Sequence, residues 1–283
     1  MQTAHMAAVD SLGASHQCPV PAMAENDPVP FSMTQHLYIL TGASRGMGLA
    51  MAEQLLSANS FVLCISRNIN EALAARAAEL GSKLEQWPLD LEHSVGAAAT
   101  LTQWLDSRKT GSFASATLIN NAGVIPRIAP LSASDPGDLA RTLRVGLEAP
   151  LLLTAAFLGA TESWNIPRKV LNISSGLGRR AMASQAAYCA AKAGMDHFTR
   201  CLVLDEALKP NGAKACSLAP GVIDTDMQVQ LRHADAADFP DQGNFVALKA
   251  NSQLASPADA AAQVLAYLAR PDFGRNPIGD VRD

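Results

Sequence analysis

The sequence predicts one doubly wound α/β domain, in which helices cover both faces of a parallel β-sheet. From residue 35 onward, short apolar segments alternate with longer stretches rich in alanine and leucine. Continuous short apolar runs are typical of strands that are buried on both faces. Glycine and proline cluster just after these runs, at the sheet edge where such folds bind their ligands.

Five short apolar segments are predicted to be strands, because turn-forming residues follow them. They are His36–Leu40, Phe61–Ile65, Ala116–Asn120, Val170–Ile173 and Ala213–Leu218. Six longer stretches have the composition of helices. They are Met47–Ala58, Asn70–Leu80, Ser94–Ser107, Asp138–Ala160, Ala186–Leu208 and Pro257–Leu268. The long stretch Gly221–Leu254 is irregular, and we expect it to form a lid over the ligand site.

Composition restricts the class of protein. The chain has 283 residues, 48% of them hydrophobic, and a formal net charge of −4, which argues against nucleic acid or an anionic membrane as partner. No apolar run reaches the ~18 residues expected of a membrane span. The five cysteines form no C-x-x-C pair and the six histidines have no metal-ligand spacing. We therefore expect a cytoplasmic protein with reduced thiols and no metal site.

Residues 1–34 differ from the rest of the chain. They contain four prolines, show no clear periodicity, and lack an uninterrupted apolar segment preceded by basic residues. We expect a flexible leader rather than a signal peptide, followed by one domain over residues 35–283. A start codon at Met33, just before the first predicted strand, is an equally good interpretation of this region.

The segment Thr41–Gly48 joins the first predicted strand to the first predicted helix, and it contains Gly42, Gly46 and Gly48. Glycine lets the backbone turn tightly and approach a phosphate, and the helix that follows supplies N–H donors and the positive end of its dipole. The spacing is G-x-x-x-G-x-G rather than the commoner G-x-G-x-x-G. This turn predicts a dinucleotide site. Its other contacting residues are expected to be Ser44, Arg45 and Met47.

The end of the second predicted strand indicates which dinucleotide is bound. Sites for NAD usually place an acidic residue there to bind the ribose 2′-hydroxyl. This chain has Ser66, Arg67 and Asn68 instead, and Arg45 in the glycine turn can reach the same place. Two guanidinium groups suit a 2′-phosphate, so we expect NADP(H), although both arginines could also be ordinary solvated surface residues.

Two further loops are expected to contact the cofactor. Asp90 and Leu91 are expected to follow a further strand, third in chain order and without a range above, and to face the adenine. The segment Asn120–Gly123 follows the fourth strand, and its last three residues are expected to hold the ribose and to brace that strand end. These three residues are Asn121, Ala122 and Gly123.

The chemistry of the site is indicated by Ser175, Tyr188 and Lys192. Tyr188 and Lys192 are four residues apart and lie on one face of a predicted helix. Transfer of a hydride to a ketone develops negative charge on oxygen, which needs a proton donor and a hydrogen bond. A free tyrosine has a pKa of ~10, and a neighbouring ammonium group is expected to lower it. Ser175 is expected to supply the second hydrogen bond to the substrate oxygen.

With these motifs the chain resembles the short-chain dehydrogenase/reductase family, over roughly residues 35–283. The resemblance implies a Rossmann-type fold and extends to the segment Pro220–Thr225. It further implies that Val222 or Ile223 faces the nicotinamide and that Thr225 binds its carboxamide end. Pro220 and Gly221 are then the remaining cofactor contacts of this segment.

Two narrower features concern the branch of the family and its catalytic relay. Asp224–Gln228 and the ending Asp280–Asp283 resemble the sepiapterin reductase and benzil reductase branch. In sepiapterin reductases a C-terminal aspartate anchors the pterin, and Asp280 falls at the matching place; alternatively, Asp280 only closes the last strand. The family usually has an asparagine in the helix where this chain has Gly146. Either a water replaces that side chain, or turnover is weak.

These features predict an NADPH-dependent reductase of a ketone or diketone. Two other interpretations remain open: an NADP-dependent alcohol dehydrogenase that works in the oxidative direction, and a sensor or scaffold that binds NADP without turnover. We expect the partner to be a small carbonyl compound and the protein to assemble as a homodimer or homotetramer. The sequence does not name the physiological substrate.

Overall fold

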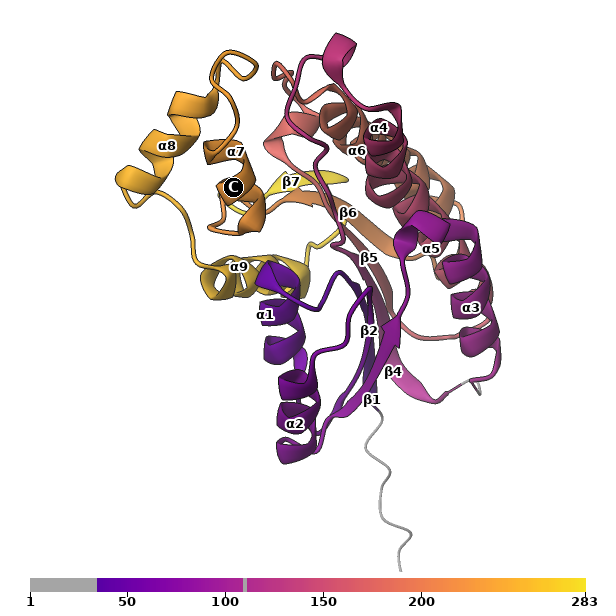
Figure 1. Ribbon diagram of the computed structural model, residues 1–283. Helices are drawn as coiled ribbons and strands as arrows, with labels where there is room; N and C mark the ends of the chain where they lie inside the picture. Colours follow the sequence, from indigo (N-terminus) through magenta and orange to yellow (C-terminus); the bar gives the residue numbers. More distant parts are fainter. Residues whose placement is uncertain (1–34, 109–110) are drawn as a thin grey trace, which may run out of the picture. The chain divides into compact units, whose positions relative to one another are not determined.

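The computed structural model describes residues 35–108 and 111–283, and in this part of the chain seven strands form one parallel sheet (Figure 1). The strand order is β3-β2-β1-β4-β5-β6-β7, so the chain reverses its direction across the sheet between β1 and β4. The strands are β1 (Gln35–Thr41), β2 (Ser60–Ser66), β3 (Lys83–Pro88), β4 (Phe113–Asn120), β5 (Arg168–Ile173), β6 (Lys214–Ala219) and β7 (Ile278–Asp280). This arrangement confirms the predicted doubly wound fold. The expected leader, residues 1–34, lies outside the described residues.

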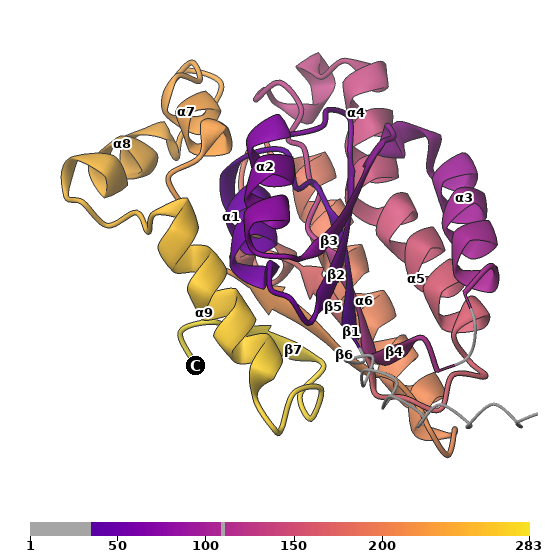
Figure 2. The same cartoon turned by 90° about the horizontal axis from the view of Figure 1, so that it is seen from below.

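Helices cover the sheet on both faces (Figure 2). One layer contains α1 (Gly46–Leu55), α2 (Glu71–Glu79) and α9 (Pro257–Ala269), and the other contains α3 (Ser94–Asp106), α4 (Pro136–Leu143), α5 (Ala149–Ala160) and α6 (Ala186–Ala207). Short 3₁₀ turns occur at η1 (Leu91–His93), η2 (Leu131–Ala133) and η4 (Gly176–Gly178). Each layer has its own apolar core, because neighbouring residues of a strand point to opposite faces. In β1, for example, Ile39 packs in one core and Leu40 in the other, and both are fully buried.

Two strands of the described structure have no predicted range. The edge strand β3 has the sequence Lys-Leu-Glu-Gln-Trp-Pro, which is too polar to be recognised as a buried strand. It nevertheless pairs in register with β2, with Leu84 opposite Val62. β7 has only three residues and forms the other edge beside β6.

Residues 221–254, predicted as a lid, contain two short helices, α7 (Asp226–Arg232) and α8 (Gln242–Ala250). A small apolar cluster separate from the two main cores holds this region together. Its buried members are Ile128, Leu231 and Phe239. The ring of Phe239 is fully buried and stacks on Phe245, with 5.6 Å between the ring centroids.

In the described residues, the stretch Pro136–Ala160 is long and apolar enough to cross a membrane by length and composition. In the structure this stretch is a core helix. It packs against the sheet through four buried side chains, Val145, Ala149, Leu153 and Phe157. The sequence predicts one helix over Asp138–Ala160. The structure instead divides it by a π-helical turn, η3 (Arg144–Glu148).

Gly146 lies in the middle of this π-helical turn and is buried. A Cβ atom on Gly146 would lie 3.1 Å from the Cβ of Ala191 on α6, closer than ordinary van der Waals contact. Ala191 precedes Lys192, so the glycine allows η3 to approach the helix that carries the predicted catalytic residues. In an ordinary helix interior glycine is less favourable than alanine, but this position differs in two ways. The local helix is π-helical, and close packing favours the smaller residue.

We predict opposite effects of alanine at two helical glycines. Gly96 in α3 faces open space, with no neighbouring atom within 4 Å of the point that a Cβ atom would occupy, so Gly96→Ala should raise the free energy of unfolding by up to ~1 kcal/mol. Gly146→Ala should lower it by ~1–3 kcal/mol, because the Ala191 methyl group cannot move without its backbone. Urea unfolding of both variants tests this. A Gly146→Ala variant at least as stable as Gly96→Ala would contradict the packing argument.

Candidate active site

A cavity of about 760 Å³ lies at the carboxyl ends of the parallel strands. Every residue predicted to bind the cofactor or substrate, or to act in catalysis, lines it. From β1 to α1 these are Gly42, Ser44, Arg45, Gly46, Met47 and Gly48, and from β2 to β4 they are Arg67, Asp90, Leu91, Asn121, Ala122 and Gly123. From β5 to the C-terminus they are Ser175, Tyr188, Lys192, Pro220, Gly221, Val222, Ile223, Thr225 and Asp280. The fold therefore brings the whole predicted set together, while the individual roles stay predictions.

The structure requires glycine at the three positions of the first turn for different reasons. Gly42 and Gly46 have φ angles of 70° and 57°, a region in which residues with a side chain are strained. Gly48 has no room for one, since a Cβ atom there would lie 2.0 Å from the carbonyl oxygen of Gly42. These constraints fix the shape of the turn at the start of α1.

The end of β4 holds this turn in place. The Asn121 side chain donates from Nδ2 to the carbonyl oxygens of Thr41 (3.0 Å) and Gly42 (3.2 Å). In return, the Thr41 hydroxyl accepts hydrogen bonds from the backbone N–H groups of Asn121 and Ala122, at 2.9 and 3.0 Å. We call these four hydrogen bonds the β1–β4 seam. The predicted bracing role of Asn121 is thus visible as a set of contacts.

The N-terminus of α1 fits an anionic phosphate. Its N-cap residue Arg45 has extended backbone and makes no side-chain cap, and within the described helix no acidic residue occupies the first turn. The first N–H groups of a helix need partners from outside the helix, and the dipole makes this end positive. At the cavity wall they are free to bind the pyrophosphate of a dinucleotide.

The two predicted phosphate-binding arginines differ in their surroundings. The Arg45 guanidinium forms an ion pair with Asp226 at the start of α7, and both side chains are about 70% exposed. Exposed pairs of this kind contribute only ~0–1 kcal/mol, so the contact is readily exchanged. Arg67 follows β2, is exposed at the cavity, and has no ion pair within the described residues. Of the two arginines, Arg67 is therefore the more available to bind a phosphate group.

The loop after β3 is ordered by Asp90. Its Oδ1 accepts a hydrogen bond of 3.0 Å from the backbone N–H of Glu92, which caps the 3₁₀ turn η1. This turn buries Leu91 next to the cavity. The geometry gives the loop a fixed shape, and facing the adenine remains its predicted role.

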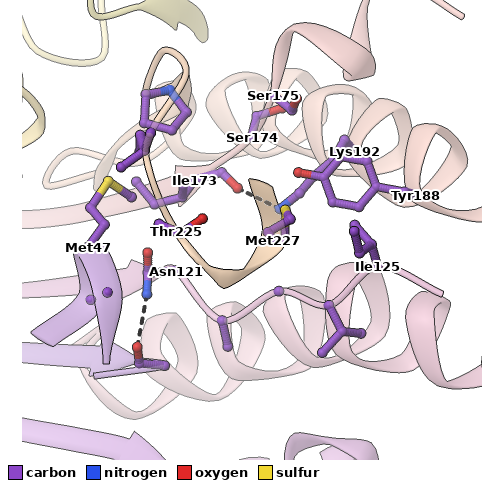
Figure 3. A pocket seen from close by; sticks show the side chains of 18 of the residues that line it. Met47, Asn121, Ile125, Ile173, Ser174, Ser175, Tyr188, Lys192, Thr225 and Met227 are labelled. Carbon is purple, nitrogen blue, oxygen red and sulfur yellow. Dashed lines mark hydrogen bonds between the residues drawn. The ribbon is translucent and has the colours of Figure 1, made fainter. Parts of the chain in front are cut away.

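Tyr188 and Lys192 lie one turn apart on α6 and are both buried (Figure 3). Lys192 Nζ donates a 2.7 Å hydrogen bond to the carbonyl oxygen of Ile173 at the end of β5, and it lies 5.8 Å from the centroid of the Tyr188 ring. Ser175 follows β5, and its hydroxyl caps η4 by accepting from the N–H of Leu177 at 3.1 Å. The strand end thus positions both the lysine and the serine.

The pKa values of this pair correct one expectation. Burial raises the pKa of Tyr188 to about 12, and the hydrogen bond to Ser175 only partly opposes this. The net shift is therefore opposite to the lowering that we expect from the sequence, because burial disfavours the charged phenolate. Burial likewise lowers the pKa of Lys192 to about 8. Near neutral pH the tyrosine is fully protonated and can give a proton away, beside a lysine that is still mostly charged.

Sequence reasoning missed an ion pair between a buried carboxylate and a partly exposed arginine behind the lysine. Asp196 lies one turn beyond Lys192 and is buried; its Oδ1 accepts 2.6 Å from the Ser217 hydroxyl of β6, and its Oδ2 lies 3.4 Å from Arg179 Nε. Arg179 also donates to the carbonyl oxygen of Gly279 in β7, at 2.8 Å. The pair ties α6 and two strands to the loop after Ser175. The spacing of Lys192 and Asp196, one helical turn, is the signal that could have indicated it.

Asp280 has a partner in its own neighbourhood. Its two carboxylate oxygens accept from Arg282 Nε at 2.7 Å and Nη2 at 2.6 Å. The Arg282 guanidinium lowers the pKa of this carboxyl group, so it is ionised and already paired. Asp280 ends β7 and lines the cavity, which fits both of its predicted roles. To anchor a ligand, the Asp280 carboxylate would have to bind the ligand and Arg282 at the same time.

In residues 35–108 and 111–283, no group of three or more histidine, cysteine, aspartate or glutamate side chains is placed to hold a metal ion. The cavity offers binding groups for a phosphate-bearing organic ligand, and Tyr188 and Lys192 are among its titratable groups.

The family model for short chain dehydrogenase matches residues 36–236. The chain belongs to the short-chain dehydrogenase family. A benzil reductase ((S)-benzoin forming) of Bacillus cereus is 35% identical over 243 residues, which cover 86% of this chain and 96% of that protein. A sepiapterin reductase of Meriones unguiculatus is 30% identical and covers 83% of this chain and 92% of its own. The predicted family and branch are thereby confirmed.

Among solved structures, a metagenomic short-chain oxidoreductase in complex with NADP is 26% identical, with a TM-score of 0.65. The match covers 88% of this short-chain dehydrogenase and 96% of the solved chain. These comparisons support a carbonyl reductase that uses a nicotinamide cofactor.

Asp196 should set the pH range in which this short-chain dehydrogenase works. Lys192 carries its charge below a pKa of about 8 and loses it above, so carbonyl reduction should fall as the pH rises through about 8. The Asp196 carboxylate raises that pKa. In Asp196→Asn the fall should begin at lower pH, whereas Asp205→Asn, an exposed position on the same helix, should keep the wild-type profile. Identical profiles in a folded Asp196→Asn variant would contradict this role.

Proposed function

We propose that the protein is an NADPH-dependent carbonyl reductase that converts a ketone or diketone to an alcohol. The observation that carries the proposal is the convergence of Ser175, Tyr188 and Lys192 on the cavity that also contains the glycine turn. The names of the benzil reductase and sepiapterin reductase relatives support this substrate class.

The binding of NADPH is supported by the shape and charge of one half of the cavity. The glycine turn and the N-terminus of α1 would hold the pyrophosphate, and Arg67 would pair with the 2′-phosphate. Arg45 can join it by leaving Asp226. When bound, the nicotinamide supplies the hydride. The solved relative with NADP supports the choice of this cofactor.

The protein groups supply the proton and stabilise charge. Tyr188 donates its hydroxyl proton to the carbonyl oxygen as that oxygen becomes negative, and the Ser175 hydroxyl donates a hydrogen bond to the same oxygen. The Lys192 ammonium group, held by its hydrogen bond to Ile173, stabilises the tyrosinate that remains. Burial keeps water away from these groups, and the product is an alcohol.

The structure favours reduction over the two other interpretations. In the oxidative direction Tyr188 would have to act as a base, and a pKa of about 12 makes its phenolate rare near neutral pH. A non-catalytic NADP sensor is suggested only by Gly146, and this glycine has a packing reason of its own. A sensor would have no need of the buried proton donor Tyr188 or of the buried Lys192 beside it.

The cavity wall also carries apolar side chains, which suit a ketone with alkyl or aryl substituents. These apolar residues are Ile125, Met182, Met227, Leu231 and Phe245, of which Ile125 and Met227 are labelled in Figure 3. Methionine side chains adapt to ligands of different shape.

We also propose a cytoplasmic location and a homodimer or homotetramer. The four cysteines of the described residues are free thiols. Burial raises the pKa of Cys64 to about 12 and that of Cys216 to about 11, so these two thiols are unreactive. Reduced, unpaired thiols suit the cytosol. The assembly stays a prediction and can be measured by light scattering.

Tyr188→Phe should lose turnover by ~10²–10⁴-fold while it still binds NADPH, because the ring remains and only the proton donor is lost. Tyr38→Phe in β1 is the matched control and should keep normal rates. The measurement is NADPH oxidation with a panel of diketones and pterins, together with a fluorescence titration of cofactor binding. Near-normal turnover of Tyr188→Phe, or no turnover of wild type with any carbonyl compound, would refute the proposal.

Arg67→Asp should weaken NADPH binding by ~10–100-fold, which corresponds to the loss of one charge-assisted contact. Binding of NADH should change little, since it has no 2′-phosphate. Arg275→Asp, an exposed position outside the residues that line the cavity, makes the same change in net charge and is the control. If wild type binds NADH as tightly as NADPH, the assignment of Arg67 is wrong.

A further inference from the structure

Two of the cationic side chains that line the cavity have no partner in the protein. The cationic residues of the wall are Arg45, Arg67, Arg141, Arg180, Lys192 and Arg282. Three of the arginines form ion pairs with acidic side chains, and the lysine donates a hydrogen bond to a backbone carbonyl oxygen. Within the described residues, the guanidinium groups of Arg67 and Arg180 form neither an ion pair nor a hydrogen bond. Both are therefore available to an anionic ligand.

Arg67 and Arg180 lie at different ends of the cavity. Arg67 directly follows β2 and has a proposed partner in the 2′-phosphate of NADPH, whereas Arg180 lies in the loop that follows β5. Two strands, β1 and β4, separate β2 from β5. Neighbouring strands are ~4.8 Å apart, so the ends of β2 and β5 are ~14 Å apart. We therefore assign Arg180 to a different anionic group from the one that Arg67 binds.

The loop after β5 brings Arg180 close to Ser175. The Ser175 hydroxyl caps the turn η4, and the backbone N–H of Arg180 donates a 3.1 Å hydrogen bond to the carbonyl oxygen of Gly176. The neighbouring Arg179 is directed away from the cavity, to the buried Asp196. Arg180 instead is exposed and lines the cavity. Its side chain thus starts next to the serine that contacts the reacting carbonyl oxygen in the proposed mechanism.

We propose that Arg180 binds a carboxylate group of the substrate and so selects ketones that carry one. This inference rests on the proposed carbonyl reductase activity and names a substrate class for it, an oxo acid. Tyr188 and Ser175 contact the oxygen of the ketone that is reduced, and Arg180 holds the carboxylate in another part of the same molecule. Arg180 is then a specificity-determining residue that takes no part in the transfer of hydride or proton.

The chemistry of the guanidinium group favours a carboxylate as its partner. The group is planar, is always charged, and can donate two parallel hydrogen bonds to the two oxygens of a carboxylate. It is also weakly hydrated, which suits its place between Leu177 and Met182, two apolar residues of the cavity wall. The cavity contains no spare acidic group for it within the described residues. Each aspartate of the wall already has a partner of its own.

The test compares an oxo acid with its own methyl ester, which keeps the ketone and removes the negative charge. A longer pair is para-acetylbenzoate with its methyl ester, and a shorter pair is levulinate with its methyl ester. The quantity measured is kcat/KM for NADPH-dependent reduction of each compound by wild type, Arg180→Met, Arg180→Lys and Arg275→Met. Lysine keeps the charge that methionine removes. Arg275 is exposed and lies outside the residues that line the cavity, so Arg275→Met controls for the change in net charge.

In Arg180→Met, the ratio of kcat/KM for the acid to kcat/KM for the ester should fall ~3–10-fold in at least one pair, a scale between those of an exposed ion pair and a charge-assisted hydrogen bond. Arg180→Lys should keep a higher ratio than Arg180→Met, and Arg275→Met should keep the wild-type ratio. Added salt should lower the ratio in wild type more than in Arg180→Met, because it screens the charges. Melting temperature and the Kd of NADPH report whether each variant keeps its fold and its cofactor site.

The outcomes separate the inference from the proposed function. If Arg180→Met has the wild-type ratio in both pairs, Arg180 is only a solvated surface residue and the inference is wrong, while the reductase activity stands. A weaker affinity of Arg180→Met for NADPH would place the guanidinium group on the cofactor and would also overturn the inference. If wild type reduces no carbonyl compound at all, the proposed function fails and the inference fails with it.

A second measurement applies if wild type reduces a neutral ketone but none of these acids and esters. The inhibition constants of the same compounds against that ketone then replace kcat/KM. The acid should inhibit wild type more strongly than it inhibits Arg180→Met, relative to its ester. Equal relative inhibition of the two proteins would contradict a carboxylate site at Arg180.

Discussion

The site depends on the seam between the first and fourth strands. The chain reverses its winding between β1 and β4, so the helices that follow these strands leave on opposite faces and open a crevice at their carboxyl ends. The Thr41 and Asn121 hydrogen bonds hold this edge together. The hydrogen bonds continue from β4 to β5, because Asn120 Nδ2 donates a 2.8 Å hydrogen bond to Asn172 Oδ1. β5 is the strand that leads to Ser175. Cofactor turn and catalytic strand are thus parts of one hydrogen-bonded framework.

Burial gives the catalytic pair its chemical character. Removing Tyr188 and Lys192 from water moves their pKa values in opposite directions, since burial penalises the anion of one and the cation of the other. The tyrosine becomes a weaker acid, and it gives up its proton only when a strong base forms beside it. A carbonyl oxygen that is gaining negative charge is such a base. The buried Asp196 limits the loss of positive charge on Lys192, so this environment suits a reductase.

Much of the fold and site could be predicted because parallel strands bring their carboxyl ends together. A glycine turn, an Asn-Asn-Ala-Gly segment and a serine that each follow an apolar run must then meet at one edge. The missed features depend on contacts that no local pattern records. β3 pairs with β2 although its own composition is polar, and the close approach of Gly146 to Ala191 joins two segments that are distant in the sequence. The expected lowering of the tyrosine pKa has the wrong sign because desolvation, which raises this pKa, depends on tertiary burial that no local pattern records.

The β1–β4 seam also constrains how the chain can fold. Thr41 and Asn121 are 80 residues apart, so their hydrogen bonds cannot form during synthesis until the fourth strand has emerged from the ribosome. Until then β1 can pair only with β2, and the backbone N–H and C=O groups of its other edge have no partner. Non-local parallel pairing is slow, and unpaired apolar edges favour aggregation. The central strand pair that defines the cofactor site is therefore also the step at which a nascent chain is most exposed to misassembly.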